Sequence, residues 1–372
     1  MAIPVIPIAN PKAQYLTIKD EISQAVAGVF EGCQFILGDN VKSLEQEVPP
    51  LCDAKFGVTV NSGTDAIVIA LAACGVGPGD EVITTPYTFV ATTEAIMIVG
   101  AKPVYVDIQP DTFNLEPAQI EAKITERTKA ILPVHLYGQC ADIEEIEAIA
   151  KKHNLKLVGD GAQAIGSMHK DKGIGAFGDA ATLSFFPTKN LGACGDGGMV
   201  LTNDENVEHM CRSLRFHGMN NGYSYERVGY CSRMDEIQAA VLRVKLKRMK
   251  QWNEGRRANA AHYLEQLADL PLKLPQAKPE NYHIYHQFTI RFEKRDELKT
   301  ALAERGVGAG IYYPSPLHLE KAYASLGYKV GDLPQAEKAA AEVLSLPVFP
   351  ELAREDVEQV AKAVRESVGE LI

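Results

Sequence analysis

The middle of the chain alternates short β-branched runs with segments of helical pattern, and this alternation limits the fold more than any other feature. The strands are expected at 57–60 (GVTV), 81–84 (EVIT), 103–108 (PVYVDI), 130–138 (AILPVHLYG) and 155–160 (LKLVGD). The helices are expected at 65–75, 91–100, 118–124 and 143–153. This spacing indicates βαβ units, hence an α/β fold whose mainly parallel sheet carries helices on both faces. Such sheets bind ligands at the carboxyl ends of their strands.

The pattern changes after residue 235. Residues 235–267 have apolar side chains at helical spacing with a basic face, which predicts long helices leading out of the first domain. Beyond them, HQFTIRF, ELKTALAERG, GIYYPSPLH and a helical C-terminus indicate a smaller α+β lobe. We predict a large domain over 1–250, which begins with a helical segment, and a small domain over 251–372.

Composition excludes several classes of function. Of the 372 residues, 46% are hydrophobic and 23% charged, as in ordinary globular proteins, and the net charge of -10 argues against nucleic-acid binding. Membrane helices and a secretory signal are not expected, because no apolar run approaches the necessary length and the N-terminus lacks a basic start. The seven scattered cysteines form no C-x-x-C pair, which predicts reduced thiols, no metal site and a cytoplasmic protein.

The first candidate site is NSGTDAI, residues 61–67, between an expected strand and an expected helix. The backbone N–H groups and hydroxyls of Ser62, Gly63 and Thr64 are placed to hold a phosphate at the helix N-terminus. The alternative is simple N-capping by Ser62 or Thr64. The segment matches neither the Walker pattern nor G-x-G-x-x-G, which disfavours nucleotide hydrolysis and hydride transfer.

Two further candidates follow later strands. Asp160 of GDGAQ ends one strand, where it either caps the next turn or faces a ligand's cation. Lys189 lies in SFFPTKNLGACGDGG, 184–198, together with the Ser184 hydroxyl. Lys189 lies 29 residues after Asp160, which is close to one βαβ unit, so both are expected at the same edge of the sheet. A lysine at the end of a buried strand costs stability unless it has a partner or a function, and the alternative is a surface loop lysine.

Together these groups match the needs of pyridoxal phosphate. Lysine forms a Schiff base and moves protons, a carboxylate keeps the pyridine nitrogen protonated, and a helix N-terminus holds the phosphate. The aromatic that stacks on the ring is predicted to be Phe89 of PYTFVAT, with Tyr87 as the alternative.

Nearly the whole chain resembles the DegT/DnrJ/StrS family of pyridoxal-phosphate-dependent nucleotide-sugar aminotransferases. The resemblance rests on GTDAI, VGPGDEVITTPYTFVAT, GAKPVYVDI, PVHLYGQ, DGAQAIG, SFFPTKNLGACGDGG, GYCSRMDEIQAA, WNEGRR and GIYYPSPLH in this order. It implies a fold-type I, aspartate-aminotransferase-like architecture and a homodimer whose sites are completed by the partner chain. Because Lys189 is present, it implies transamination instead of the dehydration carried out by members with histidine there.

The resemblance also implies residue roles. Lys189 would bind the cofactor covalently, Asp160 would pair with the pyridine nitrogen, and Gln163 would lie near the phenolic oxygen. The phosphate would be bound by Gly63, Thr64 and Ser184, with Phe89 on the ring face. The segment around Arg233 would reach into the neighbour's site, and Tyr313 and His318 would lie near the nucleotide-sugar.

Two positions depart from the family pattern. Cys231 replaces an asparagine that contacts the phosphate from the partner chain, and cysteine is a weaker hydrogen-bonding group. Gly159 replaces an acidic residue before Asp160, with little expected consequence. His217 and His135 are expected either to line the site or to be structural.

We therefore predict a ping-pong transfer of an amino group from L-glutamate to a dTDP- or UDP-linked keto-sugar. LYGQCAD and SFFPTKNLG look most like members that act on 3-keto sugars. The product would be an amino sugar for a surface polysaccharide, such as the O-antigen of lipopolysaccharide, or for a glycosylated metabolite. The alternatives are a 4-keto sugar or another cyclic ketone, and a non-catalytic binding or regulatory homologue.

Overall fold

The computed structural model describes residues 5–220 and 222–372, and its centre is a seven-stranded sheet. The strand order is β1-β9-β8-β5-β4-β2-β3. The bounds are β1 Phe56–Val60, β2 Glu81–Thr84, β3 Lys102–Tyr105, β4 Thr128–Leu132, β5 Lys156–Asp160, β8 Ala180–Ser184 and β9 Gly198–Thr202. Strands β3, β2, β4, β5 and β8 are parallel, and β9 runs antiparallel to its neighbours β8 and β1. The predicted α/β fold with a mainly parallel sheet is confirmed.

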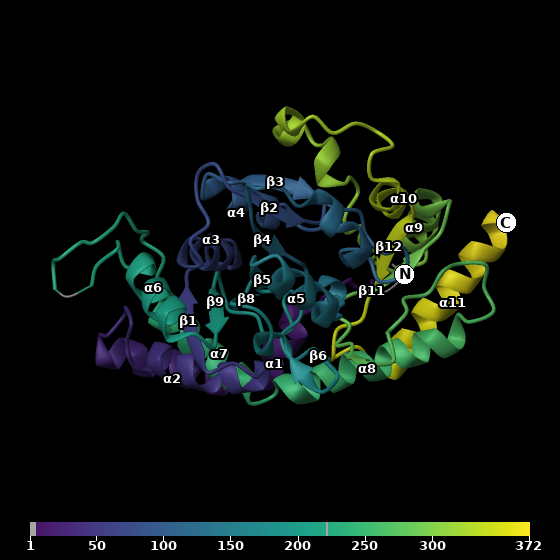
Figure 1. The fold of residues 1–372 in the computed structure, drawn as a ribbon. Coiled ribbons are helices and arrows are strands. Elements are labelled where there is room, and N and C mark those ends of the chain that lie inside the picture. Colours follow the sequence, from purple (N-terminus) through teal and green to yellow (C-terminus); the bar gives the residue numbers. More distant parts are fainter. Residues whose placement is uncertain (1–4, 221) are drawn as a thin grey trace.

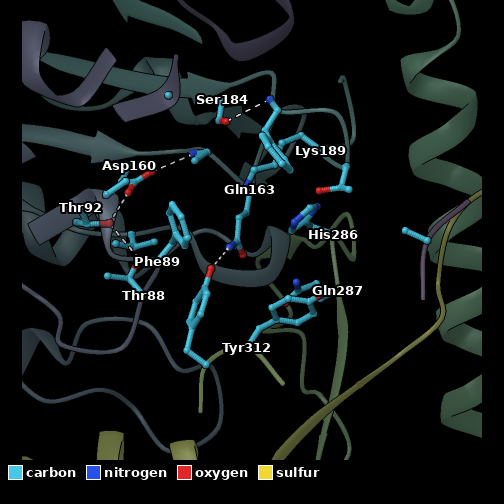
Figure 2. A pocket seen from close by; sticks show the side chains of 18 of the residues that line it. Thr88, Phe89, Thr92, Asp160, Gln163, Ser184, Lys189, His286, Gln287 and Tyr312 are labelled. Atoms are coloured by element: carbon cyan, nitrogen blue, oxygen red, sulfur yellow. Dashed lines mark hydrogen bonds between the residues drawn. The ribbon is translucent and has the colours of Figure 1, made fainter. Parts of the chain in front are cut away.

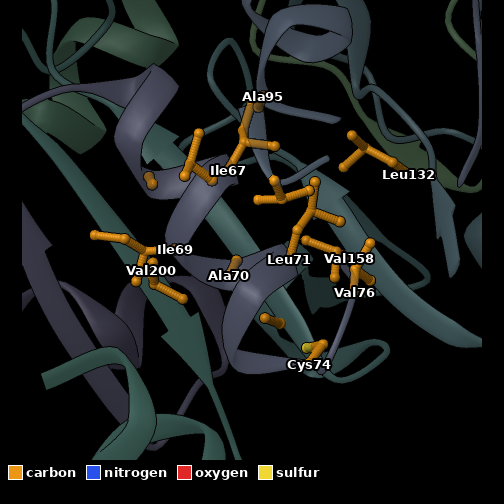
Figure 3. Packing of buried hydrophobic residues seen from close by; sticks show 14 of the residues in the cluster. Ile67, Ile69, Ala70, Leu71, Cys74, Val76, Ala95, Leu132, Val158 and Val200 are labelled. Carbon is orange, nitrogen blue, oxygen red and sulfur yellow. The ribbon is translucent and has the colours of Figure 1, made fainter. Parts of the chain in front are cut away.

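Helices cover the sheet. They are α3 Gly63–Ala73, α4 Ala91–Ile98, α5 Ile143–Lys152 and α6 Glu205–Arg215. All residues of α3 from Ala66 to Leu71 are buried, because the sheet covers one side of this helix while α4 and α6 cover others. Figure 3 shows Ile69 and Leu71 of α3 beside Val158 and Val200 of the sheet. This packing fixes the N-terminus of α3 near the carboxyl end of β8.

Long helices lie along one side of the large lobe (Figure 1). They are α1 Pro11–Gly32, α2 Asp39–Glu47, α7 Glu236–Leu246 and α8 Met249–Gln266. Ile18 and Ile22 of α1 pack against Val241, Val244 and Trp252, which joins α1 to α7 and the start of α8. The long helices predicted for 235–267 are therefore present.

The C-terminal part forms a second hydrophobic core. It contains β11 Phe288–Arg291 paired antiparallel with β12 Val343–Leu346, and helices α9 Arg295–Glu304, α10 Pro334–Glu342 and α11 Arg354–Leu371. Helix α8 links the two cores, since Met249 packs in the large lobe whereas Ala260 and Tyr263 pack in the small one. The domain boundary near residue 250 stays a prediction.

The remaining elements are short. A small sheet joins β6 Met168–His169 to β7 Lys172–Gly173 and β10 Asn281–Tyr282. The 3-10 helices are η1 Pro49–Cys52, η2 Pro117–Gln119, η3 Glu121–Lys123, η4 Leu136–Gly138, η5 Ile174–Ala176, η6 Leu317–Leu319 and η7 Lys321–Leu326.

Three local predictions were wrong. The helix expected at 118–124 is replaced by η2 and η3, since so short a segment does not sustain a helix. The strand expected at 130–138 ends at Leu132, before Pro133, which has no N–H for a sheet. Lys189 does not end a strand, because β8 stops at Ser184 and a loop carries the lysine.

Candidate active site

A cavity of about 500 Å³ lies at the carboxyl ends of β5 and β8. The large lobe supplies one wall through the start of α3 and the segments that follow these strands. The opposite wall comes from the N-terminal segment at Ile8 and Ala9 and from the small lobe at Leu346, Val348 and Phe349. The cavity therefore lies where a parallel sheet is expected to bind its ligand.

The N-terminus of α3 forms one end of the cavity. The Ser62 hydroxyl accepts a hydrogen bond from the Asp65 N–H at 3.1 Å, so Ser62 caps the helix. The N–H groups of Gly63 and Thr64 have no acceptor among the described residues, and the helix dipole favours an anion beside them. A Cβ on Gly63 would lie 2.6 Å from Cβ of Ser184, so glycine lets the helix approach the end of β8. Capping and anion binding are thus compatible here.

Asp160 supplies a buried carboxylate. Its Oδ1 accepts from the Ala162 N–H at 3.1 Å and its Oδ2 accepts from the Thr92 hydroxyl at 2.7 Å (Figure 2). Burial raises the pKa of this carboxyl, and the hydrogen bonds and Lys189 oppose the increase. No lysine or arginine within residues 5–220 and 222–372 lies within ion-pair distance of it. A cationic group of a ligand would supply the missing partner.

Lys189 lies in the loop after β8 and lines the same cavity. Its backbone N–H donates to Phe186 O at 2.9 Å, which turns the chain after the strand. Burial lowers the pKa of the Lys189 ammonium to about 8, and the charge of Asp160 opposes this change. A substantial fraction of the amine is therefore neutral at mildly alkaline pH, as a nucleophilic or proton-accepting lysine requires.

Gln163 and Phe89 border the space between Asp160 and Lys189. Gln163 Oε1 accepts from the Tyr137 N–H at 2.7 Å, and Nε2 donates to the Tyr313 hydroxyl at 3.2 Å. Phe89 is 55% exposed, and its ring lies among the cavity side chains in Figure 2. Tyr87, the alternative aromatic, is fully buried, and its hydroxyl contacts the backbone of Tyr313. Of the two rings, the structure places Phe89 in the cavity.

His286 lines the cavity and was missed by the sequence interpretation. Its Nδ1 lies 2.9 Å from Asn190 Oδ1; Asn190 Nδ2 donates to Asn253 Oδ1 at 2.7 Å, and Asn253 Nδ2 donates to Ile165 O at 3.2 Å. The backbone carbonyl at the end can only accept, so the chain of donors assigns the proton to His286 Nδ1 and leaves Nε2 as an acceptor. Burial, with Lys189 and Arg256 nearby, lowers the pKa of His286 well below its usual value, so the ring is neutral.

Three residues implicated by the resemblance lie outside this cavity. Cys231 is exposed, and its Sγ accepts from Arg233 Nη2 at 2.9 Å. His318 is buried, with Nε2 3.1 Å from Glu337 Oε1. The structure therefore brings Gly63, Thr64, Phe89, Asp160, Gln163, Ser184, Lys189 and Tyr313 together, but not Cys231, Arg233 and His318.

His135 and His217, for which the sequence left a site role and a structural role as alternatives, also lie outside the cavity lining. His135 Nδ1 accepts from the Ala141 N–H at 3.1 Å, and burial lowers the pKa of this ring to about 4. Its Nε2 has no partner among the described residues, and a Cβ on Gly159 would lie 3.0 Å from that nitrogen. Gly159 thus leaves space beside Nε2 of the neutral His135. His217 does not contribute to the lining either.

The donor set fits pyridoxal phosphate. The free N–H groups of Gly63 and Thr64 suit its phosphate, and the unpaired carboxylate of Asp160 suits its protonated ring nitrogen. Lys189, on the same lining, carries an amine of the kind that would react with its aldehyde. Groups of three or more residues arranged to hold a metal ion are absent from the described part of the chain. The same part contains no helix with the length and apolarity needed to cross a bilayer.

The sequence model of the DegT/DnrJ/EryC1/StrS aminotransferase family matches residues 16–365. A pleiotropic regulatory protein of Geobacillus stearothermophilus is 52% identical, covering 97% of this chain and 98% of the relative. A UDP-N-acetyl-3-dehydro-alpha-D-glucosamine 3-aminotransferase of Acidithiobacillus ferrooxidans is 46% identical, covering 98% of each chain. A dTDP-3-amino-3,4,6-trideoxy-alpha-D-glucose transaminase of Streptomyces venezuelae is 43% identical, covering 98% of this chain and 96% of the relative.

Solved structures of the same shape contain ligands. S. venezuelae DesV in complex with a ketimine intermediate superposes with a TM-score of 0.96 and 43% identity, covering 98% of this chain and 99% of that one. NtdA of Bacillus subtilis, solved with bound cofactor PMP, superposes with a TM-score of 0.93 and 33% identity, covering 99% of this chain and 86% of that one.

Proposed function

Because the chain belongs to the DegT/DnrJ/EryC1/StrS aminotransferase family, we propose that it transfers an amino group from L-glutamate to a nucleotide-linked keto-sugar. It is a pyridoxal-phosphate-dependent aminotransferase. The observation that carries the proposal is the position of Asp160 and Lys189 in one cavity, where Asp160 ends β5 and Lys189 lies in the loop after the adjacent parallel strand β8.

The large lobe supplies the groups that hold the cofactor. When bound, pyridoxal phosphate supplies the electron sink that lets an amino group leave one substrate and join another. The N–H groups of Gly63 and Thr64 and the Ser184 hydroxyl would hold the phosphate, and Asp160 would keep the ring nitrogen protonated. Phe89 would stack on the ring. Gln163, held by the Tyr137 N–H, would orient the phenolic oxygen.

Lys189 moves the proton. With a pKa of about 8, its amine is close to the pH at which a group both accepts and donates a proton efficiently. Burial produces this value, and the charge of Asp160 keeps it from falling further. Exclusion of water by the small-lobe wall at Leu346, Val348 and Phe349 would keep the proton between the lysine and the substrate carbon.

The acceptor we propose is a UDP- or dTDP-linked 3-keto sugar. Two relatives that match almost the whole chain carry names of enzymes that form 3-amino sugars. A 4-keto sugar or another cyclic ketone is the alternative. The test is to incubate the enzyme and L-glutamate with UDP- and dTDP-linked 3-keto and 4-keto sugars and to assign the aminated carbon by NMR. Amination only at carbon 4 would contradict the proposal. We place the reaction in the cytoplasm, in the synthesis of a polysaccharide or glycoside.

We also propose a homodimer with shared sites. The described residues between α6 and α7, 216–220 and 222–235, extend away from the body of the protein (Figure 1), and they include the almost fully exposed Tyr223 and Val228. Cys231 and Arg233, at the end of this segment, lie outside the chain's own cavity. A partner chain would cover the apolar side chains and receive Arg233 in its site, near Tyr313 and the nucleotide-sugar. His318 would act only indirectly, since it is buried against Glu337.

Mixed dimers test this arrangement. Lys189→Ala and Arg233→Ala homodimers should both be inactive, whereas a mixture of the two unfolded and refolded together should regain activity, because a mixed dimer contains one intact site. A monomer in sedimentation, or a mixture without activity, would contradict shared sites.

A second candidate function is regulation, favoured by the name of the Geobacillus stearothermophilus relative. The absorption spectrum before and after L-glutamate separates the two. A visible band that glutamate removes supports catalysis. A protein that shows no band after addition of pyridoxal phosphate would support the regulatory candidate.

A further inference from the structure

Lys189 is not the only cation on the cavity wall. Arg256, on α8, also lines the cavity, although only 8% of its surface is exposed. Its Nη1 donates to Tyr285 O at 3.4 Å and His286 O at 3.1 Å. These contacts hold the guanidinium in place but use only one of its three nitrogens. Nε and Nη2 make no hydrogen bond within the described part of the chain.

This arginine has no counterion. No carboxylate of residues 5–220 or 222–372 lies within 4.0 Å of its guanidinium. Glu351 attracts it from farther away, but burial raises the pKa of that carboxyl and leaves its Oε1 without a hydrogen-bond partner. Burial lowers the pKa of Arg256 to about 10, which still leaves it charged at neutral pH. A buried guanidinium without an anion is costly unless a ligand supplies one.

The cavity lining also includes apolar side chains from the N-terminal segment and the small lobe: Ile8, Ala9, Leu346, Val348 and Phe349. Gln287, on the same lining, has a buried Oε1 without a partner in the described chain, and this oxygen needs a donor, which an anion does not supply. Methylene groups and one anion would satisfy the apolar side chains and Arg256. The phosphate of the cofactor has its own donors at the start of α3, so the anion belongs to a different group.

We propose that Arg256 binds a carboxylate of the amino donor. This inference rests on the proposed function, because it assigns a subsite to the donor amino acid of that reaction. The planar guanidinium offers two parallel N–H donors from Nε and Nη2, which match a carboxylate, while Nη1 stays on the backbone. The apolar wall accommodates the aliphatic part of a donor such as L-glutamate, and the amino group is presented toward Lys189.

The test uses Arg256→Gln and Arg256→Lys, with Arg257→Gln as the matched control. Arg257 is the next residue, and it also anchors a backbone carbonyl, His283 O at 2.8 Å, but it does not line the cavity. The cofactor-loaded proteins are titrated with L-glutamate while the visible band is followed. Arg256→Gln should raise the half-saturating glutamate concentration about 10- to 100-fold, the range for a lost charged hydrogen bond. The half-saturating concentration of Arg256→Lys should lie between those of the wild type and Arg256→Gln. That of Arg257→Gln should equal the wild-type value.

A second readout does not require turnover. Glutarate, a dicarboxylate without an amino group, should raise the thermal midpoint of the loaded wild type and of Arg257→Gln but not of Arg256→Gln. The affinity for pyridoxal phosphate should be the same in all variants. Unchanged glutamate and glutarate responses in Arg256→Gln would overturn the proposal. Loss of pyridoxal phosphate affinity in parallel with the glutamate response would also overturn it, because the role would then be structural.

Two amines decide which carboxylate is bound. If Arg256 binds the α-carboxylate, Arg256→Gln should weaken the spectral response to L-2-aminobutyrate. The spectral response to 4-aminobutyrate should then stay unchanged. If it is the distal carboxylate, the pattern should reverse. If glutamate leaves the wild-type spectrum unchanged, the proposed transamination from glutamate fails. The glutarate shifts of the wild type and Arg256→Gln then still decide whether Arg256 forms a carboxylate site.

Discussion

Asp160, the last residue of β5, and Lys189, in the loop after the adjacent strand β8, face one cavity, yet their charged atoms lie more than 4.0 Å apart. Opposite charges in a buried site normally form a direct ion pair, because each charge loses its water. A ligand with a basic nitrogen and an aldehyde would give each of the two groups a partner of its own. Such a ligand would explain why two opposite charges line one cavity without forming an ion pair.

Replacing Lys189 with Met should abolish transamination and the visible band of the covalently bound cofactor. The reason is that no other lysine lines the cavity in the described chain. Borohydride reduction of the wild type should attach the cofactor mass to the peptide that contains Lys189. Lys170→Met is the control, since Lys170 is an exposed residue paired with Glu144, and it should keep both the band and the activity. Turnover by Lys189→Met would contradict the assignment.

Asp160→Asn should lower kcat about 100-fold or more, the usual cost of removing one preorganised electrostatic group. The amide is nearly isosteric, but it no longer stabilises a protonated ring nitrogen. A ¹⁵N spectrum of labelled cofactor should report a protonated nitrogen in the wild type and an unprotonated one in the variant. Thr92→Val removes only the hydrogen bond to Oδ2 and should have a smaller effect. Equal losses in the two variants would argue against the charge as the cause.

The sequence predicted the cavity's central residues because their positions follow from strand spacing. Asp160 ends β5, and Lys189 lies in the loop after the adjacent parallel strand β8, so the topology brings both residues to the carboxyl ends of these strands. His286 was missed because the two amides that fix its proton, those of Asn190 and Asn253, are far away in the sequence. Arg256 lies in 235–267, which the sequence predicted only as helices with a basic face, and the packing of α8 against the small lobe shows that it is buried.

Other differences have local physical causes. The segment 118–124 has a helical pattern but is too short to form more than 3-10 turns on its own. Cys231 and Arg233 came from the family resemblance, and a single chain places them outside the cavity, so their predicted roles depend on a second chain. Contacts between two chains leave no periodic pattern in the sequence of one chain. The spacing of the strands therefore could not indicate the roles of Cys231 and Arg233.

Gly63→Ala should weaken cofactor binding and lower the unfolding free energy by about 1–3 kcal/mol, as expected for overpacking. The new Cβ would lie 2.6 Å from Ser184 Cβ and 3.2 Å from Ser184 Cα, so the helix start or the strand end must shift. The measurements are urea unfolding of the cofactor-free protein and titration with pyridoxal phosphate. Gly28→Ala is the control, because Gly28 is exposed inside α1 with open space around it. That change should stabilise the protein by about 0.5–1 kcal/mol.

His286 should stay neutral and keep its proton on Nδ1 through the pH range of activity. Burial lowers its pKa well below the usual value, with Lys189 and Arg256 contributing. A ¹⁵N–¹H long-range NMR spectrum should show this tautomer unchanged between about pH 6 and 8, the range in which an unperturbed histidine titrates. Asn253→Leu removes the amide that orients Asn190 and should mix the two tautomers. A protonated ring in the wild type at pH 7 would contradict the hydrogen-bond assignment.

The pKa of Lys189 gives a prediction that needs no substrate. In the cofactor-free protein, burial lowers this pKa to about 8, so carbamylation of the amine by cyanate should rise with pH around a midpoint near 8. Lys170, whose pKa is raised by its hydrogen bond with Glu144, serves as the internal reference and should react only at higher pH. Peptide mass spectrometry measures both residues in one digest.

Asp160→Asn should move the Lys189 midpoint to lower pH, because the carboxylate raises the lysine's pKa and its removal leaves burial unopposed. The same shift affects stability. Between pH 8 and the ordinary lysine value of about 10.4, the unfolded chain binds more protons at this residue than the folded one, so the unfolding free energy rises with pH there. Lys189→Met should therefore be more stable than the wild type at pH 7, and the difference should shrink toward pH 10. A Lys189 midpoint that Asp160→Asn leaves unchanged would mean that the two residues do not share an electrostatic environment, and the case for one cofactor between them would fail.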